Sequence, residues 1–434
     1  MAEASLNNEI TDFSQWGYYD SLINMQEFKI SISEDIENIN LYEIISLITN
    51  VQGIYKYLVL ENRLLTEQEF LEKMFENITY SVSSNYYFDK LEKELDESSI
   101  VKVIEKINNE INMVYVTEDE KPFLNNNGFN ALGIVYPRKN DRVFVPVCKF
   151  DEKYFETLFV YKFERNDGTE SFRTCSVKID RINLNVFFFC NNPGYRNKKN
   201  ESDFEQENKI SSSDQFYYSV KNILSKNESI EFELHDTREE KKKMFEFCNL
   251  LNKEMVKDYE NELTTKIKEI CIKHIDEISS TISPLAKLDK VVKGKIYKKV
   301  FSTYLGESMM QSCDEEDLVF IAAERGLPGY PTLIDFVSSA ASRGKTKTIN
   351  KNSPLTFEEV FYSLNTDFGE NQELEEWRIS WFDSYYFDNA KTTDVSQSTI
   401  KIKKKYFKIT NLNVIRKNKK MVEFIIGELR KNLY

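Results

Sequence analysis

The chain has 434 residues, of which 41% are hydrophobic and 30% charged, and its formal net charge is −13. Glycine (13) and proline (8) are scarce while phenylalanine (31) and tyrosine (24) are abundant, which excludes a disordered or collagen-like chain and predicts a folded protein of two or three domains. No stretch approaches eighteen uncharged apolar residues, and residues 1–15 lack the pattern of a signal peptide, so neither a membrane span nor export is predicted.

The six cysteines lie at wide spacing, mostly inside apolar segments. This distribution predicts reduced, packed thiols rather than a disulfide framework, and therefore a cytoplasmic location. The richness in lysine, asparagine, isoleucine and glutamate is typical of proteins encoded by AT-rich genomes, which indicates a bacterial or phage source.

Residues 1–112 are predicted to form an N-terminal helical domain. Apolar side chains recur at intervals of three and four residues from Leu41, and again from about Ser98. Between these segments, Thr66-Glu67-Gln68-Glu69 has the pattern of a capping box, in which a hydroxyl and a carboxylate each satisfy a backbone amide at a helix start. Three helices are therefore expected after residue 40.

Residues 113–235 are predicted to form an antiparallel β-rich domain, because the apolar period changes from 3.6 to 2 at Met113. Asn166-Asp167-Gly168-Thr169 is typical of a hairpin turn, since Asp-Gly tolerates positive φ. Val186–Cys190 is apolar on both pleat faces and is expected at the centre of the sheet. Residues 191–214 hold few apolar side chains and are predicted to form a mobile loop. The other strands expected here are Ala131–Tyr136, Val143–Phe150, Thr157–Arg165, Glu170–Ile179 and Ser229–Leu234.

Residues 236–434 are predicted to form a large, mainly α-helical domain, which makes the fold class α+β. An apolar stripe runs from Met244 to Ile278 after a second capping-box pattern at Thr237, so one helix of roughly forty residues, on the order of 60 Å long, is expected. The other elements expected here are helices at Lys290–Tyr304, at Glu316–Arg325, from Pro331, at Phe357–Leu364 and at the aromatic segment Glu373–Phe387, then a basic strand at Thr399–Ile409 and a final helix at Lys419–Leu433.

Positive charge is concentrated in Ser398–Tyr434, which holds eleven Lys or Arg and two acids, a net charge of +9. Since the whole chain carries −13, residues 1–397 carry −22. Cations beside aromatic rings can bind phosphates and stack on bases, and an acidic remainder would orient nucleic acid toward this region. The residues predicted to bind DNA or RNA are Lys401, Lys403, Lys404, Lys405, Tyr406, Lys408, Arg416, Lys417, Lys419, Lys420, Trp377, Trp381, Arg343, Lys345 and Lys347.

The function predicted from this pattern is that of a non-enzymatic nucleic-acid-binding subunit of a larger intracellular assembly, of the transcription, replication or defence type. A second hypothesis is a structural or adaptor protein, whose lysines meet an acidic protein surface and whose long helix docks other subunits. A third is a metal-dependent nuclease: Asp141 and Asp151 flank the strand Val143–Phe150, and Lys153 follows, an order of groups that can hold Mg²⁺ and orient water.

No cofactor or metal site is predicted. Ser339–Thr346 ends like a phosphate-binding P-loop, but the strand before it and the helix after it are not expected. Cys271 and His274 lie one helical turn apart, as zinc ligands can, but the chain has only two histidines and no second pair. His274 is therefore expected to be a core residue of the long helix.

Overall fold

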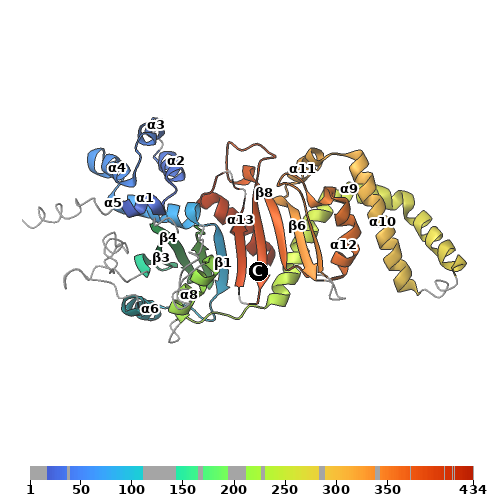
Figure 1. The fold of residues 1–434 in the computed structure, drawn as a ribbon, viewed down its shortest axis with the longest axis horizontal. Coiled ribbons are helices and arrows are strands. Elements are labelled where there is room, and N and C mark those ends of the chain that lie inside the picture. Colours follow the sequence, from blue (N-terminus) through green and yellow to red (C-terminus); the bar gives the residue numbers. More distant parts are fainter. Residues whose placement is uncertain are drawn as a thin grey trace, which may run out of the picture. The chain divides into compact units, whose positions relative to one another are not determined.

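The computed structural model describes residues 17–36, 40–110, 143–164, 170–193, 212–225, 230–282, 289–337, 343–371, 373–404, 406–412, 414 and 416–433. The chain divides into two compact units (Figure 1). Unit 1 comprises residues 1–234 with 416–419, and unit 2 comprises residues 235–415 with 420–434. Both units combine helices with antiparallel strands, so the predicted α+β class is confirmed. A separate domain for residues 1–112 stays a prediction.

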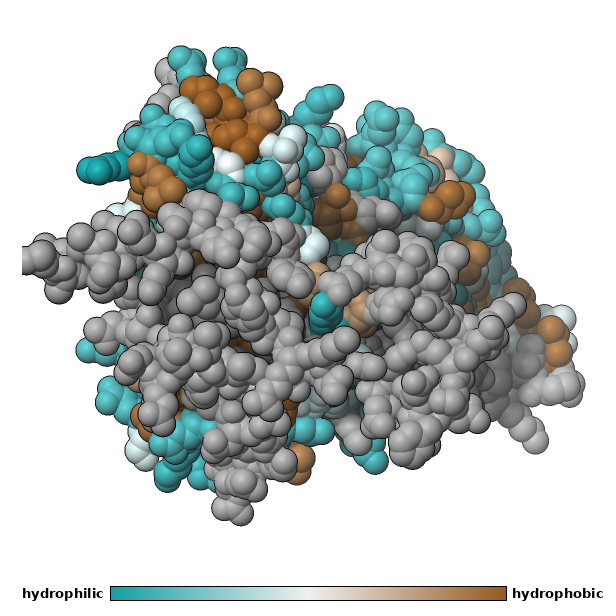
Figure 2. Space-filling view, turned by 60° about the vertical axis from the view of Figure 1, so that its left-hand side comes forward, coloured by the Kyte–Doolittle hydropathy of each residue, from teal (hydrophilic) through white to brown (hydrophobic). Residues whose placement is uncertain are grey.

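The described part of unit 1 begins with short helices: α1 (Gly17–Leu22), α2 (Met25–Asp35), α3 (Leu41–Ser46), α4 (Val51–Tyr55) and α5 (Glu67–Glu76). The capping box at the start of α5 is confirmed, because Thr66 Oγ1 accepts from the Glu69 amide at 3.2 Å and the Glu69 carboxylate accepts from the Thr66 amide at 2.8 Å. Leu47, directly after α3, is 83% exposed, and apolar surface is visible over these helices at the top of Figure 2.

The sheet of unit 1 is antiparallel, with the strand order β2-β3-β4-β5-β1. β2 (Val143–Phe150), β3 (Tyr154–Glu164), β4 (Glu170–Asp180) and β5 (Asn185–Cys190) confirm four predicted strands. β5 pairs with β4 on one side and with β1 on the other, as expected of a central strand. β1 (Asn85–Lys90) lies in the segment predicted to be helical. That prediction is wrong there, because five of the six residues of β1 are buried and no alternation marks them as a strand.

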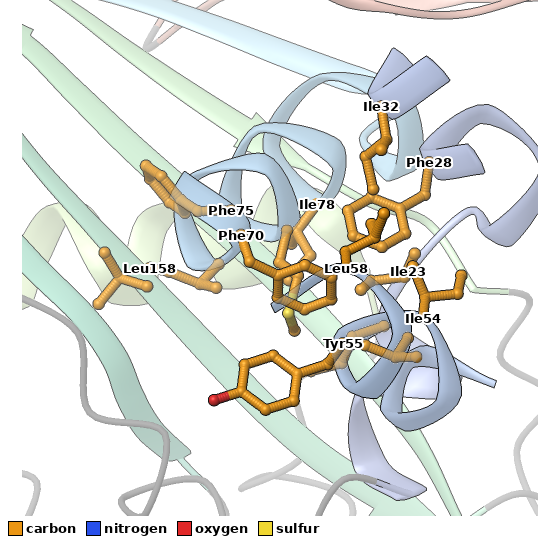
Figure 3. Packing of buried hydrophobic residues seen from close by; sticks show 14 of the residues in the cluster. Ile23, Phe28, Ile32, Ile54, Tyr55, Leu58, Phe70, Phe75, Ile78 and Leu158 are labelled. Atoms are coloured by element: carbon orange, nitrogen blue, oxygen red, sulfur yellow. The ribbon is translucent and has the colours of Figure 1, made fainter. Parts of the chain in front are cut away.

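The helices of unit 1 pack onto this sheet through one apolar core (Figure 3). Phe28 of α2 and Tyr55 of α4 both meet the ring of Phe70 of α5 edge-on, with ring centroids 5.6 and 5.3 Å apart. Leu158 of β3 reaches the same cluster from the sheet. Side chains of both the helices and the sheet therefore form one apolar core, which stabilises this unit.

Two further helices belong to unit 1, α6 (Glu97–Glu110) and α8 (Ser213–Ser225). The strand predicted at Ser229–Leu234 is reduced to a single β-bridge between Phe232 and Leu91. The strand predicted at Ala131–Tyr136, the turn at Asn166–Thr169 and most of the loop at 191–214 lie outside the described residues.

The helices of unit 2 are α9 (Thr237–Thr281), α10 (Lys290–Ser312), α11 (Glu315–Glu324), α12 (Glu359–Asn371) and α13 (Lys419–Leu433). The long helix is confirmed, although Asp236 rather than Thr237 caps it by accepting the Glu239 amide at 3.2 Å. α9 and α10 form a helical hairpin that reaches away from the sheet of this unit (Figure 1). The prediction for His274 is wrong: its side chain is 68% exposed, because α9 turns Cys271 and Ile275 inward there instead.

The sheet of unit 2 is antiparallel, with the order β10-β9-β8-β6-β7. Its strands are β6 (Gly329–Val337), β7 (Arg343–Lys347), β8 (Glu376–Phe382), β9 (Val395–Lys403) and β10 (Tyr406–Asn411). The predicted helices from Pro331 and at Glu373–Phe387 are wrong, since these segments form β6 and β8. Pro331 lies at an irregularity of the β6–β8 pairing, where a missing amide is tolerated. Trp377 and Trp381 are four residues apart, a spacing that shares one face in a helix and in a strand alike.

One face of this sheet is covered by helices of the same unit. Phe247 of α9 meets Trp377 edge-on at 5.5 Å, and Phe424 of α13 meets Trp381 edge-on at 6.1 Å. Phe336 of β6 packs on α12. Both tryptophans are fully buried as a result, and the charged side chains of these strands lie on the opposite face.

Candidate nucleic-acid interface

The strand register of unit 2 aligns five charged side chains across the whole sheet. Lys345 of β7 pairs with Asp335 of β6, Asp335 with Glu376 of β8, Glu376 with Lys401 of β9, and Lys401 with Lys408 of β10. Directly opposed residues of an antiparallel pair lie on the same face, so this row crosses the sheet on the face that points away from Trp377. The row spans four interstrand spacings of about 4.8 Å, or roughly 19 Å.

Further basic side chains share this face, because side chains alternate along each strand. Among the described residues of the face, seven are basic and two are acidic, and together they are called the basic sheet face below. The basic residues are Arg343, Lys345, Lys347, Arg378, Lys401, Lys403 and Lys408, and the acidic ones are Asp335 and Glu376. Tyr406 of β10 stands opposite Lys403 on the same face and is half-buried.

The two carboxylates of this face hold some of the cations in fixed positions. Asp335 is fully buried and accepts from Arg343 Nε at 2.7 Å and from Lys345 Nζ at 3.1 Å. Burial by itself raises the pKa of the Asp335 carboxyl, but the hydrogen bonds and charges of Arg343 and Lys345 outweigh it and hold the pKa below its usual range. Asp335 therefore stays ionised and anchors two cations whose side chains remain 59% and 46% exposed.

The second carboxylate, Glu376, accepts from Lys401 Nζ at 2.6 Å. Arg378 donates from Nε to Thr399 Oγ1 at 3.3 Å, which extends its guanidinium along the sheet. Lys347 is exposed in β7, Lys403 is exposed at the end of β9, and Lys404 is exposed in the turn after β9. Since the acids are outnumbered, the face retains positive charge after its ion pairs are formed.

Most of the aromatic side chains considered for base stacking are buried. Trp377 and Trp381 are fully buried on the other face of the sheet, so neither ring is open to a nucleobase. Phe407 is also buried, and Tyr406 is the ring of this group that lies on the basic sheet face. Lys420 is exposed at the start of α13, and Lys405 lies outside the described residues.

Arg416, Lys417 and Lys419 belong to unit 1 and not to the basic sheet face. The Arg416 guanidinium donates from Nε to both oxygens of Glu27, at 2.9 and 2.8 Å, and from its two terminal nitrogens to Glu34, at 2.9 and 3.1 Å. Lys419 pairs with Glu76 at 3.1 Å. These cations are held by carboxylates of unit 1, which is the arrangement that a structural role requires.

Lys417 is half-buried against a backbone carbonyl, and its Nζ donates to Val82 O at 3.3 Å. Burial lowers the pKa of its ammonium group to about 8. A lysine of the unfolded chain titrates near 10.4, so between these values the unfolded state binds more protons and the contribution of Lys417 to stability rises with pH.

We therefore expect Lys417→Met to stabilise the protein at pH 7 by about 2 kcal/mol, since about 3 kcal/mol of charge penalty is removed and about 1 kcal/mol of hydrogen bond is lost. The difference between variant and wild type should shrink toward pH 10. Urea unfolding from pH 7 to pH 10 measures it, and a difference that does not change with pH would contradict a charged, buried Lys417.

Sequence reasoning missed Arg378, Asp335 and Glu376. The alternation Glu376-Trp-Arg378-Ile-Ser-Trp could have revealed a strand with one charged and one apolar face. The strong aromatic content of the segment hid this signal, because Trp377 and Trp381 also fit a helical spacing.

The groups proposed for a nuclease site do not converge on a metal in the described residues. Asp151 caps the turn between β2 and β3, where its carboxylate accepts from the backbone amides of Lys153 and Tyr154 at 2.7 and 2.6 Å. Asp141 lies outside the described residues. In the part of the chain that the structure describes, no group of three or more acidic, histidine or cysteine side chains could hold a metal ion.

No protein-family model, no curated protein and no solved structure matches this chain. Of the helices that the structure describes, none is both long enough and apolar enough to cross a membrane.

Proposed function

We propose that the chain is a nucleic-acid-binding subunit of a larger intracellular assembly and that it contacts DNA or RNA through the basic sheet face. The observation that carries this proposal is the gathering of seven basic side chains from four strands on one face. Three of those strands, β8, β9 and β10, lie at sequence positions far from β7, which supplies Arg343, Lys345 and Lys347. Lysine and arginine on a regular surface are the groups that bind a phosphate backbone.

The form of the face favours a single strand. An antiparallel sheet offers an extended surface on which a strand can lie, and the half-buried ring of Tyr406 lies on the same face. The row of about 19 Å is long enough for several phosphates of an extended strand. Asp335 and Glu376 fix the cations before binding, which reduces the entropy lost when the complex forms.

The remaining charge of the chain supports an oriented encounter. Residues 1–397 carry a net negative charge although they include four of the basic residues on the face, so most of the surface repels a polyanion. A steep salt dependence is expected from binding of this kind.

We expect the affinity of the full chain for a short single-stranded oligonucleotide to fall by about 100-fold between about 50 and 200 mM salt, the result of roughly five phosphate contacts at a slope of about −0.7 each. Fluorescence anisotropy measures this with labelled oligo-dT and oligo-U, and a hairpin duplex of equal charge shows any preference for single strands. An affinity that does not change with salt, or an absence of binding at low salt, would reject the proposal.

A second candidate function is protein docking through the α9–α10 hairpin. Ile270 and Ile278 of α9 are each 55% exposed, and Val291 of α10 is 67% exposed. Three exposed apolar side chains on one helical hairpin favour docking of a protein partner there. Light scattering on the purified chain tests for self-association, and this function is compatible with nucleic-acid binding at the basic sheet face.

A further inference from the structure

Glu376 is a carboxylate of the basic sheet face that the neighbouring cations do not saturate. It stands at the centre of the charged row, in register with Asp335 on one side and with Lys401 on the other. Its Oε2 accepts from Lys401 Nζ at 2.6 Å, whereas its Oε1 has no hydrogen-bond partner among the described residues. The side chain is 14% exposed, and Oε1 carries part of this exposure. A hydrogen-bond donor from outside the protein can therefore reach it.

Asp335, the other carboxylate of this face among the described residues, is used differently. It is fully buried, its Oδ1 accepts from Arg343 Nε at 2.7 Å, and its Oδ2 accepts from Lys345 Nζ at 3.1 Å. Both of its oxygens therefore hold cations in position. The carboxylate that remains available to a ligand is that of Glu376.

An open carboxylate does not suit a surface that binds phosphate alone. Its charge repels a phosphodiester backbone, and the backbone of DNA carries no hydrogen-bond donor that could compensate for this repulsion. The backbone of RNA carries one donor on every nucleotide, the ribose 2′-OH, which is the group that lets a protein distinguish RNA from DNA. Carboxylates accept from ribose hydroxyls in the same way in dinucleotide-binding sites.

The surroundings of Glu376 fit the position of a ribose, because each ribose in a strand lies between two phosphates and Glu376 lies between two cations. Lys401 is one interstrand spacing of about 4.8 Å away, and Arg378 lies two residues, about 6.7 Å, further along β8 on the same face. Both side chains are partly exposed. A phosphate at either cation therefore brings the adjoining sugar toward Glu376.

We propose that the basic sheet face selects RNA over DNA, and that Glu376 Oε1 accepts a hydrogen bond from a ribose 2′-OH while the neighbouring cations hold the flanking phosphates. This inference rests on the proposed nucleic-acid-binding function and names its substrate class. Glu376 is the specificity-determining residue, since its charge disfavours DNA and its free oxygen favours RNA.

Fluorescence anisotropy on the full chain tests the preference with labelled oligo-U, oligo-dU and 2′-fluoro oligo-U of equal length. The three strands have the same charge and closely similar bases, and the 2′-fluoro strand keeps the sugar pucker of RNA but lacks the donor. We expect oligo-U to bind at least about 5-fold more tightly than either of the other strands, the effect of one hydrogen bond to a charged acceptor.

Glu376→Met removes both the acceptor and the charge. Affinity for oligo-dU should rise by about 2–5-fold because a repulsive charge is lost, and the preference for oligo-U should fall below about twofold. The Lys401 side chain is 36% exposed, so it stays solvated without its partner, and circular dichroism verifies the fold. Glu376→Gln keeps a carbonyl oxygen in place, so part of the preference should remain. Glu423→Met, exposed in α13, changes the net charge equally and should leave the preference unchanged.

Equal binding of oligo-U and oligo-dU by the wild type, with a steep salt dependence, would overturn the RNA preference and leave the proposed function standing. A preference that 2′-fluoro oligo-U shares, or that Glu376→Met retains, would overturn the role of Glu376. Tighter binding of oligo-dC than of oligo-dU, abolished by Glu376→Met, would assign the carboxylate to the amino group of cytosine instead. Absence of binding by every strand would reject the proposed function and this inference with it.

Discussion

Replacing Lys347, Lys403 and Lys404 together by glutamate is expected to weaken binding of a single-stranded oligonucleotide by about 100-fold at moderate salt. All three side chains are exposed: Lys347 lies in the outer strand β7, Lys403 is the last residue of β9, and Lys404 lies in the turn that follows. Each reversal replaces an attraction to phosphate by a repulsion, at a cost of about 1 kcal/mol, and about 1.4 kcal/mol corresponds to a tenfold change. The slope of the logarithm of affinity against the logarithm of salt concentration should also become shallower, by the share of about two to three phosphate contacts.

The matched control reverses three exposed lysines elsewhere, Lys102, Lys268 and Lys431, and so changes the net charge by the same amount. We expect this control to weaken binding by less than about tenfold, since long-range repulsion is screened at moderate salt. Equal losses in the two triple variants would show that net charge alone governs binding and that the basic sheet face has no special role. Circular dichroism verifies that both variants fold.

Arg416→Met is expected to destabilise the protein by about 3–5 kcal/mol. Glu27 is 4% exposed, and Arg416 contacts both of its carboxylate oxygens. Removal of one partner of a buried ion pair leaves an uncompensated charge in the interior, which costs more than the pair itself contributed. The loss of the bonds to Glu34, which is more exposed, adds a smaller amount.

This effect should depend on pH in a direction that the burial of Glu27 determines. Burial raises the pKa of Glu27 above its usual range even while Arg416 opposes the shift. Without Arg416 the pKa rises further, and an acid with a raised folded-state pKa loses its contribution to stability as the pH rises through that value. Arg416→Met should therefore be more destabilising at pH 7 than at pH 5, as measured by urea unfolding.

The double variant Glu27→Met with Arg416→Met completes the cycle. Because both charges are then absent from the interior, we expect it to recover most of the stability that Arg416→Met loses. If the double variant is as unstable as the sum of the two single variants, the pair is not coupled, and the structural role of Arg416 is refuted.

Local sequence signals predicted several elements correctly because short-range physics decides them. The capping box at Thr66 and Glu69 forms within four residues, and the helix Lys419–Leu433 follows from its apolar spacing. The strands Val143–Phe150 and Glu170–Asp180 alternate clearly enough to be recognised. Each of these patterns is complete without reference to distant parts of the chain.

The apolar stripe of α9 shows where periodicity stops being informative. Met244, Cys248 and Met255 are buried as predicted, but Ile270, His274 and Ile278 face solvent in the C-terminal half. A helix as long as α9 packs on different neighbours along its length, and a single stripe cannot follow that change.

The amino-acid sequence by itself determined that this is a folded α+β protein with one very long helix and a basic C-terminal segment, because composition and local spacing carry that information. Only the tertiary structure decided how the cations are used. Strand register gathers Lys401, Lys403 and Lys408 with Arg343, Lys345 and Lys347 on one sheet face, whereas Arg416 and Lys419 pair with glutamates of unit 1. Register and ion pairing join residues far apart in the sequence, so no local pattern could assign them.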